Sequence, residues 1–338
     1  MAWFTIDTRK LPAPDRRACW ERLISEAEFP VEVHDDAGGD FYVVARQLAL
    51  DTVQISELIG YGIRVVRTEQ LIQRRDPQVY QLYLTHTGSI RHTQCGRNVR
   101  VMPGEFVLRT SSRPYESLIA SGSAVRVQFH RSALPLPRCA VDRLLAVPIG
   151  SGEAMGALLS RYLTLVTRHA GECGPPEQVI MSRTLLNMIA ALCSRELDRV
   201  SDGSPQSHRL ALLVRIHGFV EEHLDDPRLV PRTIADAHQI SLRYLHKLFQ
   251  DQGGPTVTAW IRRRRLERCR QDLVDPALSG RPINAIASRW GFTERAHFSK
   301  LFRATYGVPP GEYRHAGDAL THTQSARTDT DTLPGRAG

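Results

Sequence analysis

Hydrogen-bonding and cationic side chains gather in two similar stretches of the C-terminal third of the sequence. TIADAHQIS (233–241) aligns with AIASRWGFT (285–293), and HKLFQDQGG (246–254) aligns with SKLFRATYG (299–307). On a helix that enters the major groove of DNA, side chains of these kinds bind base edges and phosphates. The residues that we expect on two such helices are Ser241, Leu242, Arg243, His246, Lys247, Gln250, Thr293, Glu294, Arg295, His297, Ser299, Lys300 and Arg303.

The elements that must position these residues have the layout of a helix-turn-helix in each copy. The first helix of each copy carries a small residue, Ala235 or Ala287, which allows the second helix to approach closely. A hydroxyl side chain, Ser241 or Thr293, is expected to cap the N-terminus of the second helix. The offset between the copies changes from 52 to 53 residues, and we expect this one-residue slip inside the second helix.

A long helix is predicted between the two copies, over 256–274. Apolar residues such as Ile261 and Leu266 form a stripe along it, and six arginines lie around the stripe. About 19 helical residues span roughly 28 Å, which approaches the rise of one DNA turn. The second helix of each copy could then enter one of two successive major grooves. Arg262 and Arg263 at the start of the connecting helix are candidates for phosphate contacts.

The net charge is concentrated in the same part of the chain. Residues 207–316 contain 18 Arg and Lys against 11 Asp and Glu, which is a net charge of +7. Residues 1–206 carry 24 against 22, and residues 317–338 carry 2 against 3. A compact basic segment is typical of proteins that bind a polyanion.

The N-terminal part has a different pattern, that of short strands. Alternating and β-branched residues predict a sandwich or barrel preceded by a helix at 16–29. The expected strands are 41–50, 52–59, 62–68, 79–88, 89–96, 97–110 and 124–130.

Helical periodicity begins near residue 152. Helices are expected at 153–169 and 177–199, and SDGSPQSH (201–208) has the composition of a linker. The apolar residues expected on one side of the two helices are Met155, Leu158, Leu159, Tyr162, Leu163, Val166, Ile180, Leu185, Met188, Ile189 and Leu192. Further helices are expected at 208–225, 231–237, 242–251, 256–274, 283–289, 294–305 and 309–314.

Other classes of site have little support in the sequence. No stretch approaches the roughly 18 uncharged apolar residues of a membrane span, and MAWFTIDTRK has charges where a signal peptide needs an apolar core. We therefore expect a cytoplasmic protein with no membrane contact. The six cysteines are scattered without metal-site spacing, so we expect buried, reduced thiols and neither a metal nor a cofactor.

From Leu210 to Arg314 the sequence resembles the AraC/XylS family of bacterial transcription regulators. WIRRRRLERCRQDL (260–273) is similar to the family's linking helix, with Arg265-Leu266 in the usual Arg-Leu place. PINAIASRWGFTERAHFSKLFRATYGVPPGEYR (282–314) is similar to its signature, and His297 stands where an aromatic residue is usual. The resemblance implies two helix-turn-helix modules that bind double-stranded promoter DNA, and activation through RNA polymerase as the family's commoner habit.

Residues 16–140 resemble the AraC-binding-like sensor domain, a cupin-type β barrel, through MPGEFVLRT (102–110) and the RPY that follows. The resemblance implies an α+β multidomain protein with a cupin-like barrel, flanking helices and an all-α C-terminal domain. We expect a sensor at 1–150, a dimerising helical pair at 151–200, a linker at 201–208, a DNA-binding domain at 209–316 and a disordered tail at 317–338. A small-molecule effector and a homodimer are implied partners.

Three alternatives remain open for the N-terminal part. A catalytic cupin needs a metal triad, whereas His86 and His92 stand six residues apart without the usual His-x-His pair, so no catalytic residue is expected. The second alternative is that the N-terminal part only dimerises or binds a protein and senses nothing. The third is a redox sensor that uses the thiol of Cys95 beside Arg97. If the effector is acidic, the candidate pocket residues are Arg46, Arg67, Arg74, Arg109 and Arg113.

Overall fold

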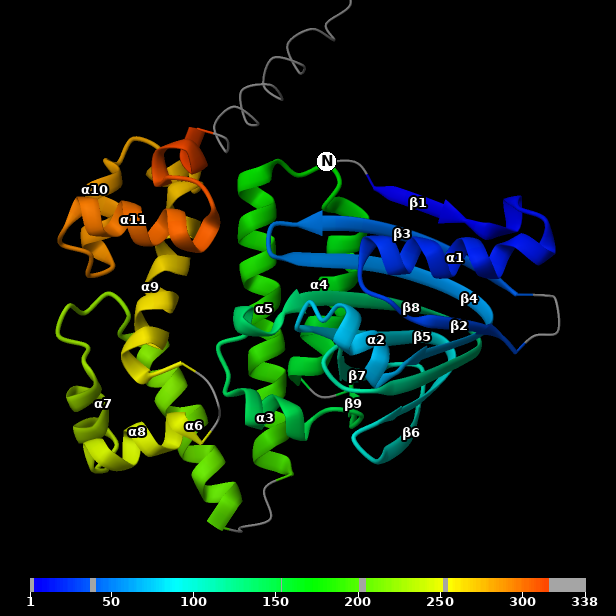
Figure 1. The fold of residues 1–338 in the computed structure, drawn as a ribbon, viewed down its shortest axis with the longest axis horizontal. Coiled ribbons are helices and arrows are strands. Elements are labelled where there is room, and N and C mark those ends of the chain that lie inside the picture. The colour runs from blue at the N-terminus through cyan, green and yellow to red at the C-terminus, as the bar shows by residue number, and fades with distance from the viewer. Residues whose placement is uncertain (1–2, 37–40, 153, 201–204, 252–254, 316–338) are drawn as a thin grey trace, which may run out of the picture. The chain divides into compact units, whose positions relative to one another are not determined.

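The computed structural model describes residues 3–36, 41–152, 154–200, 205–251 and 255–315 (Figure 1). The chain divides into two compact units. The N-terminal unit takes in Met1–Cys173 and Met181–Ser207, and the C-terminal unit takes in Gly174–Ile180 and His208–Gly338. The expected tail at 317–338 and the first half of the expected linker, 201–204, lie outside the described residues.

One curved antiparallel sheet forms the N-terminal unit, with strand order β1-β3-β4-β8-β5-β7-β9. β2 pairs with β4 beside β3, and β6 pairs with β5 beside β7, so the two long inner strands each carry two partners on one edge. The strands are β1 Phe4–Asp7, β2 Glu32–Asp35, β3 Tyr42–Leu50, β4 Val53–Arg67, β5 Val79–Gln94, β6 Arg97–Val101, β7 Glu105–Thr110, β8 Tyr115–His130 and β9 Pro148–Gly150. The predicted cupin-like sheet is confirmed as a half-barrel.

Two predicted strand breaks are wrong. The expected strands 52–59 and 62–68 form the single strand β4, because Gly62 takes a positive φ of 66° and bends the strand without ending it. The expected strands 79–88 and 89–96 likewise form β5, in which Gly88 has a φ of 72° next to the irregular pairing of β5 with β8. These bends curl the sheet, and the short strands β1, β2 and β9 complete it without having been predicted.

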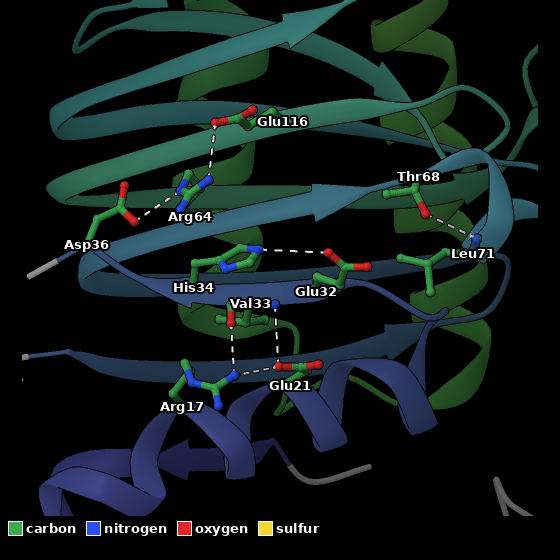
Figure 2. A network of polar contacts seen from close by, with 10 residues as sticks. All are labelled: Arg17, Glu21, Glu32, Val33, His34, Asp36, Arg64, Thr68, Leu71 and Glu116. Atoms are coloured by element: carbon green, nitrogen blue, oxygen red, sulfur yellow. Dashed lines mark hydrogen bonds and ion pairs between the residues drawn. The ribbon is translucent and has the colours of Figure 1, made fainter.

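Helix α1 (Ala13–Ala27) packs on β2 through polar contacts shown in Figure 2. The Arg17 guanidinium donates to the Val33 carbonyl at 3.1 Å and pairs with Glu21 at 3.0 Å. Glu21 in turn accepts from the Val33 amide at 3.4 Å. The helix therefore lies over the edge of the sheet where its side chains Trp20 and Ile24 join the core.

The remaining helices of the first unit are α2 Glu69–Arg74, α3 Arg138–Arg143, α4 Ala154–His169 and most of α5 Pro175–Arg199, with single 3-10 turns at Thr8–Lys10 and Arg131–Ala133. α4 buries Leu159, Leu163 and Val166 as expected from its periodicity. Leu158 and Ile180 were expected on the buried sides of α4 and α5, but both are exposed.

The described residues of the C-terminal unit form helices and the turns that connect them, without a strand. Its helices are α6 Pro205–Glu222, α7 Pro231–Ala237, α8 Leu242–Gln250, α9 Val257–Leu273, α10 Ile283–Arg289 and α11 Arg295–Tyr306, with a 3-10 turn at Pro276–Leu278 and a further helix at 310–315. α6 begins at Pro205, three residues before the expected start, so the second half of the expected linker is helical. Figure 1 shows α9 between the helix pairs α7-α8 and α10-α11.

Within the described residues, no helix combines the length and the apolar character that a membrane crossing requires. The same residues contain no group of three His, Cys, Asp or Glu side chains placed to hold a metal ion. None of the six cysteines forms a disulfide, and the expectation that they are buried holds only for Cys193 and Cys269.

Candidate nucleic-acid interface

The two helix pairs share the hydrogen bond that closes the first part of the turn. In the first pair the Ile240 amide donates to the Ala235 carbonyl at 3.0 Å, and in the second the Phe292 amide donates to the Ala287 carbonyl at 2.9 Å. Both alanines are buried, so each first helix meets its partner closely, as the sequence predicts. Each pair is a helix-turn-helix module.

The turns differ in the residue that takes a left-handed backbone conformation. Gly291 has a φ of 79°, whereas its counterpart Gln239 has a φ of 54°. A residue with a Cβ is strained in this region, so Gly291 adopts its turn conformation with less strain than Gln239 does. Gly291 also leaves room for Arg265, whose Nη1 atom would stand 2.9 Å from a Cβ at this position.

The second module corrects the expected N-cap. Ser241 caps α8 as predicted and accepts the Tyr244 amide at 3.1 Å. In the second module the N-cap is Glu294, without a side-chain cap bond, and Thr293 lies one residue before it. The one-residue slip therefore falls in the turn and not inside the second helix. α8 and α11 then correspond throughout at an offset of 53 residues, which aligns Lys247 with Lys300.

Buried side chains orient each second helix. Leu245 and Phe249 face the core from α8, and Phe298 and Phe302 do so from α11. The predicted DNA-binding residues lie on the remaining surface of these helices and at their N-termini. All of them are exposed except His246 and Ser299, which are half-buried and correspond to each other. The buried apolar residues thus hold the polar ones toward the solvent.

The exposed cations of α8 and α11 have no carboxylate partner. Among the described residues, no Asp or Glu pairs with Arg243, Lys247, Arg295 or Lys300. A cation that is not paired within the protein keeps its full charge for a phosphate or a base edge. These four side chains can therefore bind DNA without breaking an internal ion pair.

A groove of about 510 Å³ brings several predicted residues together. It runs between the segment that precedes α7, the first turns of α9, and the turn of the second module. Arg262 of α9 borders this groove with Thr293, Glu294 and His297. Arg263 is exposed on α9 but does not line the groove.

Most arginines of α9 are held inside the unit, which sequence periodicity did not predict. Glu221 of α6 pairs with Arg264 and, at 3.2 Å, with Arg268. Arg265 donates to the Leu224 and Asp226 carbonyls at 3.0 and 2.7 Å. Although burial disfavours a charged guanidinium, the Glu221 carboxylate raises the pKa of Arg264. These bonds fasten α9 to α6 and to the segment before α7.

His217 of α6 is buried among aromatic rings. Its ring centroid lies 4.1 Å from that of Trp260 and 5.6 Å from that of Phe249, and neither ring nitrogen has a hydrogen-bond partner among the described residues. Burial, and then the positive charge of Arg264, lower the pKa of His217 to about 3. The imidazole is therefore neutral in the folded protein at neutral pH.

We expect the C-terminal unit to lose stability as the pH falls below about 6.5. The unfolded chain binds a proton at His217 near that pH, and the folded chain does not until about pH 3, so protonation favours unfolding between these values. The loss from pH 7 to pH 5 is about 2 kcal/mol for one such group. Urea unfolding at both pH values measures it, and the variant His217→Phe should show a smaller difference. An equal difference in both proteins would contradict the assignment.

Two helix pairs of helix-turn-helix layout with exposed cations are typical of a DNA-binding transcription regulator, and the same chain carries a half-barrel unit. Residues 20–193 match the family model for the AraC-binding-like domain, and residues 234–316 match the model for a helix-turn-helix domain. The chain belongs to the AraC/XylS family of transcriptional regulators.

Individual relatives agree with this assignment. The chain is 31% identical to the transcriptional activator NphR of Rhodococcus sp. over 92% of both chains. It is 32% identical to the XylDLEGF operon transcriptional activator of Pseudomonas putida over 39% of both chains. The crystal structure of the AraC-like transcriptional activator CuxR superposes with a TM-score of 0.53 and 20% identity, covering 79% of this chain and 94% of that one, which shows a shared fold.

Proposed function

We propose that this protein activates transcription by placing α8 and α11 in successive major grooves of a promoter. The observation that carries the proposal is the pair of exposed cationic helix faces, each held outward by a buried core. Lys247 and Lys300 occupy equivalent places and would contact phosphates. Arg243 and Arg295 each carry a guanidinium, the group that forms bidentate contacts to guanine. Arg262 and Arg263 on α9 would add contacts to the phosphate backbone of the DNA.

The activating role rests on the two relatives NphR and the XylDLEGF operon activator, both of which are transcriptional activators. An activator bound at a promoter works on RNA polymerase, which is therefore the expected protein partner, in the cytoplasm where bacterial promoters lie. The proposal divides the chain into a sensor at 1–150, a dimerising pair at 151–200 and a DNA-binding part at 209–316. It assigns no catalytic step to the chain.

A selection of randomised DNA by the purified full-length protein, at two salt concentrations, tests the proposal. We expect enrichment of a motif with two short blocks about one helical turn apart. Specific contacts should survive the higher salt better than contacts to phosphates alone, which weaken steeply with salt. Binding without any enriched motif at both concentrations would contradict the proposal.

We further propose that the protein forms a homodimer through α4. Leu158 and Leu165 lie one heptad apart on α4 and are 57% and 55% exposed, which is unusual for leucines on a helix whose opposite side is buried. Replacing both by Asp should convert a dimer into a monomer in light scattering coupled to size exclusion. The control Met102→Asp, at an exposed apolar residue elsewhere in the same unit, should stay dimeric. A monomeric wild-type protein would rule the homodimer out.

A further inference from the structure

The concave side of the half-barrel contains a cavity. Its volume is about 60 Å³. One water needs about 10–15 Å³ of such space, so the cavity has room for more than a single water. Its walls come from α1 and from strands β3, β4, β5, β7 and β8, and most are hydrocarbon, including Ile24, Val43, Leu58 and Ile63.

The cavity wall has more positive than negative charge. Its charged groups are Arg109, Arg126 and Glu28. Arg126 donates to Glu28 Oε2 at 2.7 Å and forms a second bond with the other carboxylate oxygen, so these two charges compensate each other. No carboxylate among the described residues pairs with Arg109. One buried positive charge therefore remains without a counterion.

The partners of Arg109 are all neutral. Its guanidinium lies between the rings of Tyr83 and Tyr115, at 4.5 and 4.3 Å from their centroids. It donates to Gln81 Oε1 at 2.7 Å, to Ser117 Oγ at 3.1 Å and to the Tyr83 hydroxyl. A guanidinium has five N–H groups, so these bonds leave donors unused. Buried charges in proteins are normally paired, so an uncompensated one indicates a place for an anionic partner.

Two further donors in the wall have no partner. Ser117 Oγ accepts from Arg109 and lies 2.8 Å from His92 Nδ1, so its own proton can go to that nitrogen. A neutral imidazole that accepts at Nδ1 carries its proton at Nε2. His92 Nε2 and the Tyr115 hydroxyl have no hydrogen-bond partner among the described residues. Both side chains and Arg109 are more than nine-tenths buried.

Burial, and then the neighbouring charge of Arg109, lower the pKa of His92 to about 3. The imidazole is therefore neutral at the pH of a cell, and in the tautomer that accepts from Ser117 at Nδ1 it offers the Nε2 proton. Three unused donor groups and one uncompensated charge then meet at one cavity whose other walls are apolar.

We propose that this cavity binds a small organic anion, a monocarboxylic acid with an apolar body, whose carboxylate is held by Arg109, His92 and Tyr115. One carboxylate matches the single uncompensated charge, and the apolar body matches the hydrocarbon walls. A bidentate contact between a carboxylate and a guanidinium is among the strongest that a buried site can form. The inference deepens the proposed sensor role of the N-terminal unit and rests on it.

Thermal unfolding and calorimetry of the full-length protein, without DNA, test the inference. The probes are cyclohexanecarboxylate, benzoate and hexanoate, each compared with its primary amide, and inorganic phosphate. We expect at least one acid to raise the Tm, because a ligand that binds only the folded protein stabilises it. The acid should bind at least tenfold more tightly than its amide, because only the acid carries the charge that pairs with Arg109. Phosphate should have no effect. Equal binding of acids and amides, no binding of any acid, or equal binding of phosphate would overturn the inference.

Variants of the wall refine the test. Arg109→Gln removes the charge and should abolish the preference for acid over amide. The matched control is Arg113→Gln, a few residues along the chain, whose guanidinium pairs with Asp142 at 3.2 Å and does not line the cavity. If Arg109→Gln does not fold, Tyr115→Phe removes only a hydroxyl and should weaken acid binding several-fold. Unchanged binding in both variants would overturn the inference. Since these measurements contain no DNA, their failure is distinct from a failure of promoter binding.

Discussion

Alanine at Arg243, Lys247, Arg295 and Lys300 together is expected to abolish specific DNA binding and to leave the protein folded. All four side chains are exposed, and no described carboxylate pairs with any of them, so their removal leaves no buried partner without a bond. At about 1–3 kcal/mol for each contact, the four losses amount to a decrease in affinity of at least about a thousandfold. A fluorescence anisotropy titration with the selected DNA motif measures this decrease.

A matched control separates the contacts from the loss of charge. Alanine at Arg22, Arg74, Arg91 and Arg100 removes the same formal charge from exposed positions of the N-terminal unit. We expect this control to bind the motif with an affinity close to that of the wild-type protein. The recognition role of α8 and α11 would be wrong if the two quadruple variants lost similar amounts of affinity, or if the first retained its affinity at moderate salt.

Glu28→Ala is expected to destabilise the N-terminal unit by about 3–5 kcal/mol. The carboxylate lies at the end of α1 and pairs with Arg126 of β8, and both side chains are only 5% exposed. Arg126 also donates to Ser56 Oγ at 2.9 Å. Burial by itself disfavours the charged guanidinium, and the Glu28 carboxylate outweighs this effect and raises the pKa of Arg126. Without Glu28 the buried charge has no counterion, which is why the loss is large. Urea unfolding followed by circular dichroism measures it.

The same sheet offers an exposed ion pair for comparison. Arg46 Nε donates to Glu57 Oε2 at 2.7 Å across β3 and β4, and the two side chains are 44% and 31% exposed. Glu57→Ala should cost no more than about 1 kcal/mol because water screens the pair and solvates the remaining arginine. A similar cost for Glu28→Ala and Glu57→Ala would show that the buried pair contributes no more than a surface pair.

The helix-turn-helix modules could be predicted from sequence because the interactions that form them are local. Ala235 and Ala287 pack within a few residues of the turns that they support, so their pattern is visible in a short window. The predicted N-cap of the second module is wrong because Thr293 and Ser241 are both hydroxyl residues at aligned positions. The turn of the second module is one residue longer, and this difference leaves no mark in the composition.

The cavity could not be predicted in the same way. Of the five arginines proposed for an acidic pocket, only Arg109 lines it, whereas Arg67 is buried and donates to three backbone carbonyls. Arg126 was missed because its partner Glu28 is 98 residues away in the sequence. In strand β8 it alternates with Val125 and Val127, a pattern that predicts an exposed charge when only one face of the strand is buried.

The contacts that hold α9 in place limit the spacing between the two blocks of a DNA site. Glu221 and the carbonyls of Leu224 and Asp226 hold α9 to α6 and to the segment before α7 through three arginines. Farther along α9, Leu266 and Leu273 share a buried core with Phe298 of the second module, so we expect the two modules to keep a fixed orientation. Insertion of about five base pairs between the two blocks of a site would rotate the second block by half a turn, beyond the reach of a rigid connector. Genomic sites for this protein should therefore tolerate base changes between the blocks far better than insertions or deletions there.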